Sequence, residues 1–480
     1  MRKSASFLVI LVLFFSPLGW SQQELQTKSS AERTSVSYVS YMEGLAPGEK
    51  MPALPKTPLF LTGTTPEQLT PEYWINRLPE PDRLLKTPEQ LKFFNQEIRT
   101  MIRERVDIFQ SGVLPNGTQV RNQIKMEYET ISGRKLFDIE DVYILKKFFE
   151  VTIKPLVNWE AMPNKLAPKW GAATRATSVR ALPTDVKMLE EKGDIEFDQL
   201  QFTLIKLWTP VAILHTSKDG RWYYVQAPYV RGWVKSKYIA LFPSRKALQE
   251  KVGSNQFLAV TGESISVCSD PACQDVFQRP SMGTVLPLIR QNENGYVIQM
   301  PIRSANGNVL LKNYYIHRNS DVHIGFPSFT QRNIIRQAFK LLGARYGWGG
   351  MYNGRDCSGF THDIFLSMGV DLPRDSDQQA FSGTQLGHFE PGEGTEAKES
   401  ILGSATPGIT LLKMPMHMML YLGEVDGRFF IIHSTWAERV SMTSDEKKRI
   451  NQVVVSDMSL NGNSYLGSLF DRTIAINELN

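Results

Sequence analysis

The stretch Tyr346–Phe360, which reads YGWGGMYNGRDCSGF, decides how this sequence is interpreted. Residues 346–356 form a glycine-rich segment, the glycine-rich approach, that leads to a single cysteine, Cys357. Beyond that cysteine, apolar residues recur at helical spacing up to Gly369, and they are Phe360, Ile364, Phe365 and Met368. Glycine is a common end signal for a helix. The pattern therefore predicts a helix that begins at Cys357.

A cysteine at the start of a helix has an unusual environment. The unpaired N–H groups and the positive end of the helix dipole favour the thiolate, which is the form that attacks a carbonyl. The same N–H groups can hold an oxyanion. We therefore interpret Cys357 as a catalytic nucleophile, and the alternative is a buried, inert thiol.

A nucleophilic thiol needs a base, and two histidines follow on strand-like runs. His417 and His433 flank Asp426-Gly427, which is a strong hairpin signal. We expect His417 to take the thiol proton and His433 to orient the His417 ring. The alternative for either histidine, considered alone, is a satisfied residue of the core or of a sheet edge.

The hairpin raises a problem of register. A two-residue turn at Asp426-Gly427 places His433 opposite Leu420, three residues from His417 and on the other face of the sheet. Because side chains alternate along a strand, a bulge or a longer loop must restore the shared face.

These motifs, as an ordered set, resemble the NlpC-type family of papain-like cysteine peptidases, which cut bacterial cell-wall peptides. The set is Asp-Cys-Ser-Gly-Phe around Cys357, His-x-x-x-Tyr-Leu-Gly from His417, and the hairpin-partner histidine His433. The resemblance also gives Tyr346 a role as donor to the oxyanion, although it could simply be an aromatic wall. Met416 departs from the glycine that the family commonly has before its base.

The resemblance further implies substrate-binding residues. In family endopeptidases with two SH3-like domains, the segment matching Asp375 and Ser376 helps to hold a free L-alanine amine and a D-glutamate carboxylate, which suits their chemistry. Ser376 also begins a capping-box pattern with Gln379. Tyr229 matches a tyrosine that walls off the cleft, and the alternative is an exposed loop residue. His362 is expected at the surface.

The whole chain predicts a multidomain α+β protein with a helical N-terminal domain, two small SH3-like β-barrels and a papain-like α+β catalytic domain. A capping box at Thr87–Gln90 begins one N-terminal helix, and a second is expected near residues 138–149. The expected domains are a signal peptide at 1–21, an irregular and helical domain at 22–171, SH3-like domains at 172–245 and 253–326, and a catalytic domain at 327–480.

Composition limits the partners and the compartment. The net charge of +5 over 480 residues is too small for a nucleic-acid claim. The apolar run within residues 1–21 is too short to span a bilayer, and it predicts export to the periplasm or the extracellular space. Cys268 and Cys273 could form a disulfide or remain two buried thiols, and a zinc site would lack further ligands. We expect a monomer without a cofactor or a metal.

Three functions are compatible with this pattern. The first is an endopeptidase that hydrolyses the γ-D-glutamyl–diamino acid bond of murein peptides with a free N-terminal L-Ala. The second acts on intact peptidoglycan and uses the SH3-like domains as wall anchors. The third is a non-catalytic wall-peptide binding protein. A cleft capped by residues 172–242 would favour free peptides, and an open cleft would favour the polymer.

Overall fold

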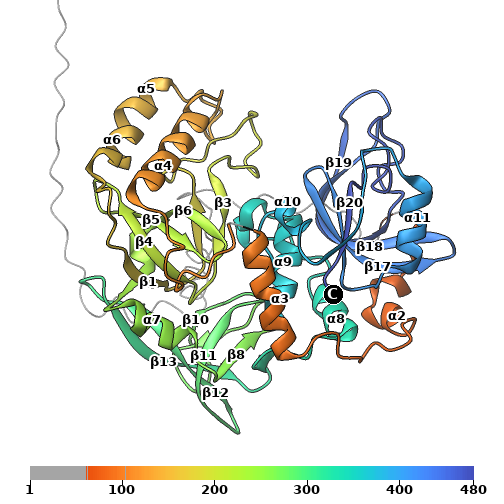
Figure 1. The fold of residues 1–480 in the computed structure, drawn as a ribbon, viewed down its shortest axis with the longest axis horizontal. Coiled ribbons are helices and arrows are strands. Elements are labelled where there is room, and N and C mark those ends of the chain that lie inside the picture. Colours follow the sequence, from red (N-terminus) through yellow and green to blue (C-terminus); the bar gives the residue numbers. More distant parts are fainter. Residues whose placement is uncertain (1–60, 62, 103) are drawn as a thin grey trace, which may run out of the picture. The chain divides into compact units, whose positions relative to one another are not determined.

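The computed structural model describes residues 61, 63–102 and 104–480. The predicted signal peptide at 1–21 lies outside these residues, as does most of the predicted irregular segment. The described part is built from helices and three antiparallel sheets, so the predicted multidomain α+β class is confirmed (Figure 1). No helix in the described ranges is both long and apolar enough to cross a membrane.

Helices dominate the region before the first sheet. The capping box at Thr87 is confirmed, because its hydroxyl accepts the Gln90 N–H and the Gln90 side chain accepts the Thr87 N–H. The helices and short helical turns are η2 (Glu67–Leu69), α2 (Pro71–Ile75), α3 (Pro88–Met101), α4 (Gly117–Ser132), α5 (Lys146–Phe148), η3 (Phe149–Ile153), α6 (Lys154–Val157) and η4 (Trp159–Ala161).

The second predicted helix was placed too early in the chain. It begins at Lys146 instead of near Asp138, because the Asp138 carboxylate accepts the N–H groups of Glu140 and Val142 and closes a turn there. Helix α4 was not predicted, although Asn116 and Gln119 form a reciprocal capping box at its start.

Two seven-stranded sheets follow, joined by α7 (Arg245–Val252). In the first, the strand order is β3-β2-β6-β5-β4-β1-β7, and in the second it is β10-β9-β13-β12-β11-β8-β14. The first consists of β1 (Lys169–Ala173), β2 (Thr177–Arg180), β3 (Gln201–Ile205), β4 (Pro210–Thr216), β5 (Trp222–Ala227), β6 (Val230–Lys235) and β7 (Ile239–Phe242), with the turn η5 (Ser236–Tyr238) before β7.

The second sheet contains the disulfide that the sequence left open. Cys268 at the end of β9 is bonded to Cys273, with their Cα atoms 5.0 Å apart. The strands are β8 (Phe257–Val260), β9 (Val267–Cys268), β10 (Val276–Gln278), β11 (Val285–Asn292), β12 (Gly295–Arg303), β13 (Val309–His317) and β14 (Val322–Ile324).

The C-terminal part combines helices with a six-stranded sheet in the order β15-β20-β16-β17-β18-β19. The helices are α8 (Gln331–Phe339), η6 (Trp348–Asn353), α9 (Cys357–Ser367), α10 (Ser376–Gln379) and α11 (Thr395–Ser404). The strands are β15 (Thr384–His388), β16 (Thr410–Met414), β17 (His417–Val425), β18 (Arg428–Arg439), β19 (Lys447–Asp457) and β20 (Ala475–Glu478).

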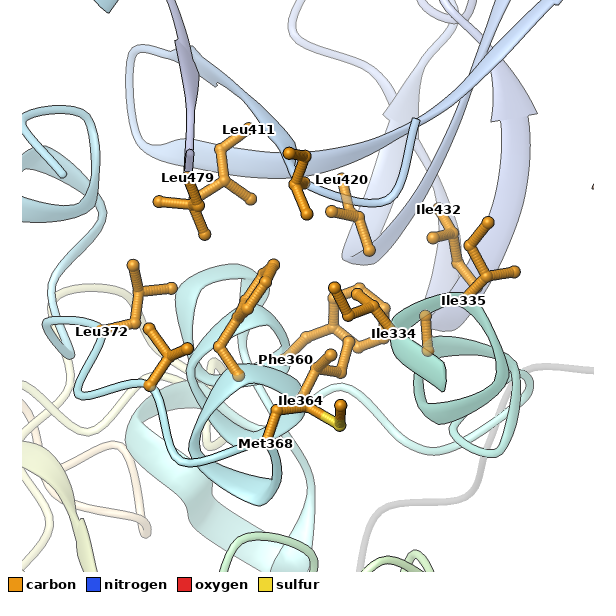
Figure 2. Packing of buried hydrophobic residues seen from close by; sticks show 14 of the residues in the cluster. Ile334, Ile335, Phe360, Ile364, Met368, Leu372, Leu411, Leu420, Ile432 and Leu479 are labelled. Atoms are coloured by element: carbon orange, nitrogen blue, oxygen red, sulfur yellow. The ribbon is translucent and has the colours of Figure 1, made fainter. Parts of the chain in front are cut away.

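A continuous apolar core joins α8 and α9 to this sheet (Figure 2). Phe360 and Ile364 of α9 and Met368, which follows this helix, belong to one cluster with the strand residues Leu411 and Leu420, and all five are fully buried. The packing fixes α9 against β17, which carries His417. The helix that begins at Cys357 and the strand that begins at His417 are therefore held together by their shared core.

Replacing Phe360 with alanine tests this core. Phe360→Ala should lower the free energy of unfolding by about 3–5 kcal/mol, because it removes a buried ring and leaves a cavity. Urea denaturation followed by tryptophan fluorescence and circular dichroism measures the loss. The matched control is Phe381→Ala in the same part of the chain, where the ring is 66% exposed and the change should stay within about 0.5 kcal/mol. Equal losses in the two variants would contradict the packing account.

Candidate active site

Asp356 fixes the start of the helix that carries Cys357. Its buried carboxylate accepts the Gly359 N–H at 2.7 Å and the Gly349 N–H at 2.8 Å, and the Arg374 guanidinium donates to it at 2.6 Å. It is thus the N-cap of α9, with Cys357 as the first helical residue. The Cys357 side chain is 7% exposed, and its Sγ lies 3.9 Å from the carbonyl oxygen of Met416.

The two histidines meet because the hairpin contains a bulge. Leu420 pairs with Ile432, and the register shifts between Tyr421 and Gly423. The sequence required either a bulge or a longer loop to place both histidines on one face of the sheet, and the structure contains the bulge. The Nε2 atom of His417 lies 2.7 Å from the Nδ1 atom of His433. On the far side, the Nε2 atom of His433 lies 3.2 Å from the hydroxyl of Ser456.

Burial governs the protonation of both imidazoles. It lowers the pKa of His417 to about 3, and the positive charges of Lys413 and Arg472 act in the same direction. Burial and then the neighbouring His417 lower the pKa of His433 well below its ordinary value. Both rings are therefore neutral near pH 7, and a neutral His417 can accept a proton.

The thiol is also neutral in the substrate-free site. Burial, followed by the charge of Asp356, raises the pKa of Cys357 to about 12, although the backbone N–H groups of Met418 and Ser358 oppose this. The first helical turn acts in the predicted direction, because the Ser358 N–H lowers the pKa of the thiol. Burial and the Asp356 charge outweigh this effect, so the thiolate is not the favoured form in the substrate-free site.

The glycine-rich approach turns sharply to bring Tyr346 beside the thiol. Gly349 and Gly350 have φ values of +53° and +82°, and a Cβ on either would collide with Gln201 or Leu204 of the first sheet's β3 segment. Tyr346 is buried, and burial followed by the charges of Cys357 and Asp356 raises the pKa of its phenol well above the ordinary value. Tyr346 is therefore a protonated donor near the thiol.

A cavity of about 650 Å³ collects most of the predicted site residues. Its walls include Tyr229, Tyr346, Cys357, Asp375 and Ser376. The two histidines are not among its lining residues. The lining also includes residues from α4 and from the first sheet, and they are Gln123, Glu127, Gln201, Phe202, Thr203, Gln226, Val230 and Arg231.

Two local predictions are corrected here. Asp375, and not Ser376, caps α10, since its carboxylate accepts the Asp377 N–H at 2.8 Å. His362 is 2% exposed instead of lying at the surface, and its ring centroid is 4.9 Å from that of Tyr229. Helix α9 has neighbours on all sides, so the helical face opposite the sheet is also buried.

The sequence reasoning did not assign roles to Asp356 or Glu127, and it included Arg374 only as part of the substrate-binding segment. The N-cap pattern Asp-x-x-Gly could have identified Asp356, but nothing local links Glu127 to the cavity. Burial raises the pKa of Glu127 to about 7, and its carboxylate accepts the Tyr224 hydroxyl at 3.1 Å. Within the described ranges, no group of three His, Cys, Asp or Glu side chains is arranged to hold a metal ion.

Two parts of the chain are similar to known protein families. A profile of the NlpC/P60 family matches residues 343–459, which contain Tyr346, Cys357, His417 and His433. The chain contains an NlpC/P60 domain. A profile of the SH3 domain of SH3b1 type matches residues 187–235, which lie in the first sheet region.

Two curated relatives are named gamma-D-glutamyl-L-lysine dipeptidyl-peptidase. The Bacillus cereus protein is 29% identical over 43% of this chain and 57% of its own length. The Bacillus subtilis protein is 35% identical over 21% of this chain and 31% of its own length. This chain therefore spans less than two thirds of either relative.

A solved structure shares the fold. It is described as a novel NlpC/P60 endopeptidase from Photobacterium damselae subsp. piscicida. Its TM-score is 0.67 at 18% identity, and the match covers 83% of this chain and 94% of that one.

The raised pKa of Cys357 predicts a distinctive pH dependence of alkylation. Only the thiolate reacts, so the iodoacetamide rate should rise about tenfold for each pH unit between pH 7 and 9 and reach no plateau there. The same protein in urea should plateau near the ordinary pKa of a thiol. Cys357→Ala is the control for label at other sites. A fast rate that is already constant between pH 5 and 8 would instead indicate a thiolate–imidazolium pair.

Proposed function

We propose that this protein is a cysteine endopeptidase that hydrolyses the γ-D-glutamyl–diamino acid bond of murein peptides with a free N-terminal L-Ala. The observation that carries the proposal is the lining of the Cys357 cavity. One side comes from the NlpC/P60 domain, and the other comes from the first sheet and α4. Such walls suit a short peptide with a free end better than a cross-linked polymer.

The proposed reaction begins with Cys357 and His417. The Sγ atom attacks the γ-carbonyl carbon of D-glutamate, and the thiol proton passes to His417. The Nε2 atom of His417 already contacts His433, which leaves Nδ1 as the proton acceptor. In this arrangement the Nε2–H of His417 donates to His433 Nδ1, and the Nε2–H of His433 donates to Ser456. The chain of hydrogen bonds selects the reactive tautomer.

The remaining steps follow the usual course of acyl transfer. The carbonyl oxygen becomes an oxyanion, and the Tyr346 hydroxyl and the Cys357 N–H donate to it. Collapse of this intermediate breaks the C–N bond, and His417 returns its proton to the leaving amine. A thioester remains on Cys357. Water, deprotonated by His417, then attacks the thioester carbon and releases L-Ala-D-Glu and the free thiol.

The substrate-binding proposal uses three cavity residues. Asp375 would hold the free ammonium of L-alanine, and the Ser376 hydroxyl would donate to the α-carboxylate of D-glutamate. Tyr229 would form the wall that limits the length of the peptide, and its buried hydroxyl already donates to the Leu204 carbonyl oxygen at 3.3 Å. The relatives named for a γ-D-glutamyl-L-lysine bond support this bond class.

We also propose that the protein works outside the cytoplasm. The disulfide between Cys268 and Cys273 supports this, because disulfides persist in oxidising compartments. The apolar run within residues 1–21 is consistent with export.

Product analysis tests the proposal directly. A chain of residues 22–480 should release L-Ala-D-Glu from L-Ala-γ-D-Glu-diaminopimelate and should release nothing from purified sacculi, with products identified by mass. Cys357→Ala should be inactive on both substrates. Products from sacculi would favour the wall hydrolase. No products from either substrate would favour the binding protein.

Acetylation of the substrate tests the free-amine requirement. The kcat/KM of the N-acetylated peptide should be at least about 100-fold lower than that of the free peptide. Acetylation removes the ammonium charge that would pair with Asp375 and adds bulk at the closed end of the cleft. Asp375→Asn should lower kcat/KM for the free peptide and narrow the gap between the two peptides. Equal kcat/KM values for the free and acetylated peptides would contradict the closed cleft.

A further inference from the structure

A carboxylate from the SH3 region is bound entirely by residues of the NlpC/P60 domain. Glu196 lies in the loop before β3 and is 6% exposed. Its Oε1 atom accepts from Arg345 at 2.6 Å and from the Asn451 side chain at 2.9 Å. Its Oε2 atom accepts from the Trp436 indole at 3.1 Å and from Arg449. Both carboxylate oxygens of Glu196 thus accept hydrogen bonds from the domain that carries Cys357.

The residue after it adds an aromatic contact. The ring of Phe197 lies 6.2 Å from Tyr346, 5.5 Å from Trp348 and 5.1 Å from Trp436, measured between ring centroids. Tyr346 and Trp348 both line the Cys357 cavity, and Phe197 is not among its lining residues. Phe197 therefore supports this part of the cavity wall without lining the cavity itself.

Two partners of Glu196 adjoin the backbone at the N–H of Tyr346. Arg345 is its immediate neighbour in the chain. The Tyr346 N–H donates to the Asn451 carbonyl oxygen at 3.1 Å, and the Asn451 side chain donates to Glu196. The Glu196 carboxylate thus binds Arg345, which precedes Tyr346, and Asn451, which accepts the Tyr346 N–H.

Neighbouring contacts follow the same segment. The Tyr352 hydroxyl donates to the Ile195 carbonyl oxygen at 3.0 Å, and the Gln201 side chain donates to the Gly349 carbonyl oxygen at 2.9 Å. Residues 195–201 therefore contact the glycine-rich segment between residues 345 and 352. A displacement of a side chain by even an ångström can remove its catalytic effect.

We propose that Glu196 is a positioning residue that holds Tyr346 where its hydroxyl can donate to the oxyanion. In this account the SH3-like domain completes the active site as well as closing the cleft. The inference rests on the proposed function, because Tyr346 must act in the reaction for its position to affect the rate.

A double-mutant cycle in residues 22–480 tests the inference with L-Ala-γ-D-Glu-diaminopimelate. Glu196→Gln should lower kcat by about 10- to 100-fold and leave KM within about twofold, since removal of one oxyanion donor costs about 100- to 1000-fold. In a Tyr346→Phe background, Glu196→Gln should have no further effect on kcat. The matched control is Glu191→Gln, an exposed glutamate in the same loop, which should keep full activity.

Further measurements separate positioning from a general structural role. The alkylation rate of Cys357 at pH 9 should stay within about twofold in Glu196→Gln, because Glu196 has no hydrogen bond to the thiol or to the histidines. Phe197→Leu provides a second cycle with Tyr346→Phe if Glu196→Gln fails to fold, and thermal unfolding monitors both variants. The same non-additivity is expected for Phe197→Leu.

Three results would overturn the inference. The first is an unchanged kcat in folded Glu196→Gln, and the second is the same loss of kcat with and without the Tyr346 hydroxyl. The third is full activity of Tyr346→Phe, which would remove the proposed role of Tyr346 while leaving peptide cleavage itself intact. Failure of the proposed function gives a different result, because the unmodified chain would then release no L-Ala-D-Glu.

Discussion

The Asp356 carboxylate is the interaction on which the rest of the site depends. It joins the first turn of α9, the glycine-rich approach and the segment that begins at Arg374 through three hydrogen bonds. A carboxylate cap of this kind stabilises a helix by about 0.5–2 kcal/mol. Its larger effect here is geometric, because Cys357, Tyr346 and the proposed substrate-binding segment are all tied to one buried group.

The same carboxylate has a chemical consequence. Its negative charge adds to desolvation in raising the pKa of Cys357 to about 12, so the arrangement that positions the thiol also keeps it protonated. Because both the thiol and His417 are neutral, the proton must move when the carbonyl is attacked in the proposed reaction. This makes the chain from His417 through His433 to Ser456 central to the proposed reaction, because it leaves one nitrogen free to accept that proton.

Local patterns predicted much of the site, and two of the features that they did not predict depend on non-local contacts. The helix at Cys357, the hairpin and its bulge follow from periodicity, turn residues and strand parity. The burial of His362 could not be predicted in this way, because it depends on Tyr229, which is distant in sequence. Nor could the protonation of Cys357, since desolvation depends on every element packed around it. The Glu196 contacts join residues separated by 149 or more positions.

The N-terminal helices illustrate the same limit. An amphipathic pattern identifies an apolar face, but it does not say what the polar face contacts. Gln123 and Glu127 on α4 line the Cys357 cavity, so a helix that the sequence analysis did not predict contributes to the site. Phe202 and Arg231 of the SH3 region also line this cavity. Three regions of the chain thus shape one cavity, and only one of them carries the nucleophile.

The most direct test of the central claim is to detect the covalent intermediate on Cys357. Rapid acid quenching of residues 22–480 with L-Ala-γ-D-Glu-diaminopimelate, followed by intact-mass and peptide mass spectrometry, would locate it. The account predicts an L-Ala-D-Glu acyl group on the peptide that contains Cys357, absent from Cys357→Ala. Turnover of the peptide without any acyl group on Cys357, or turnover by Cys357→Ala, would contradict the account.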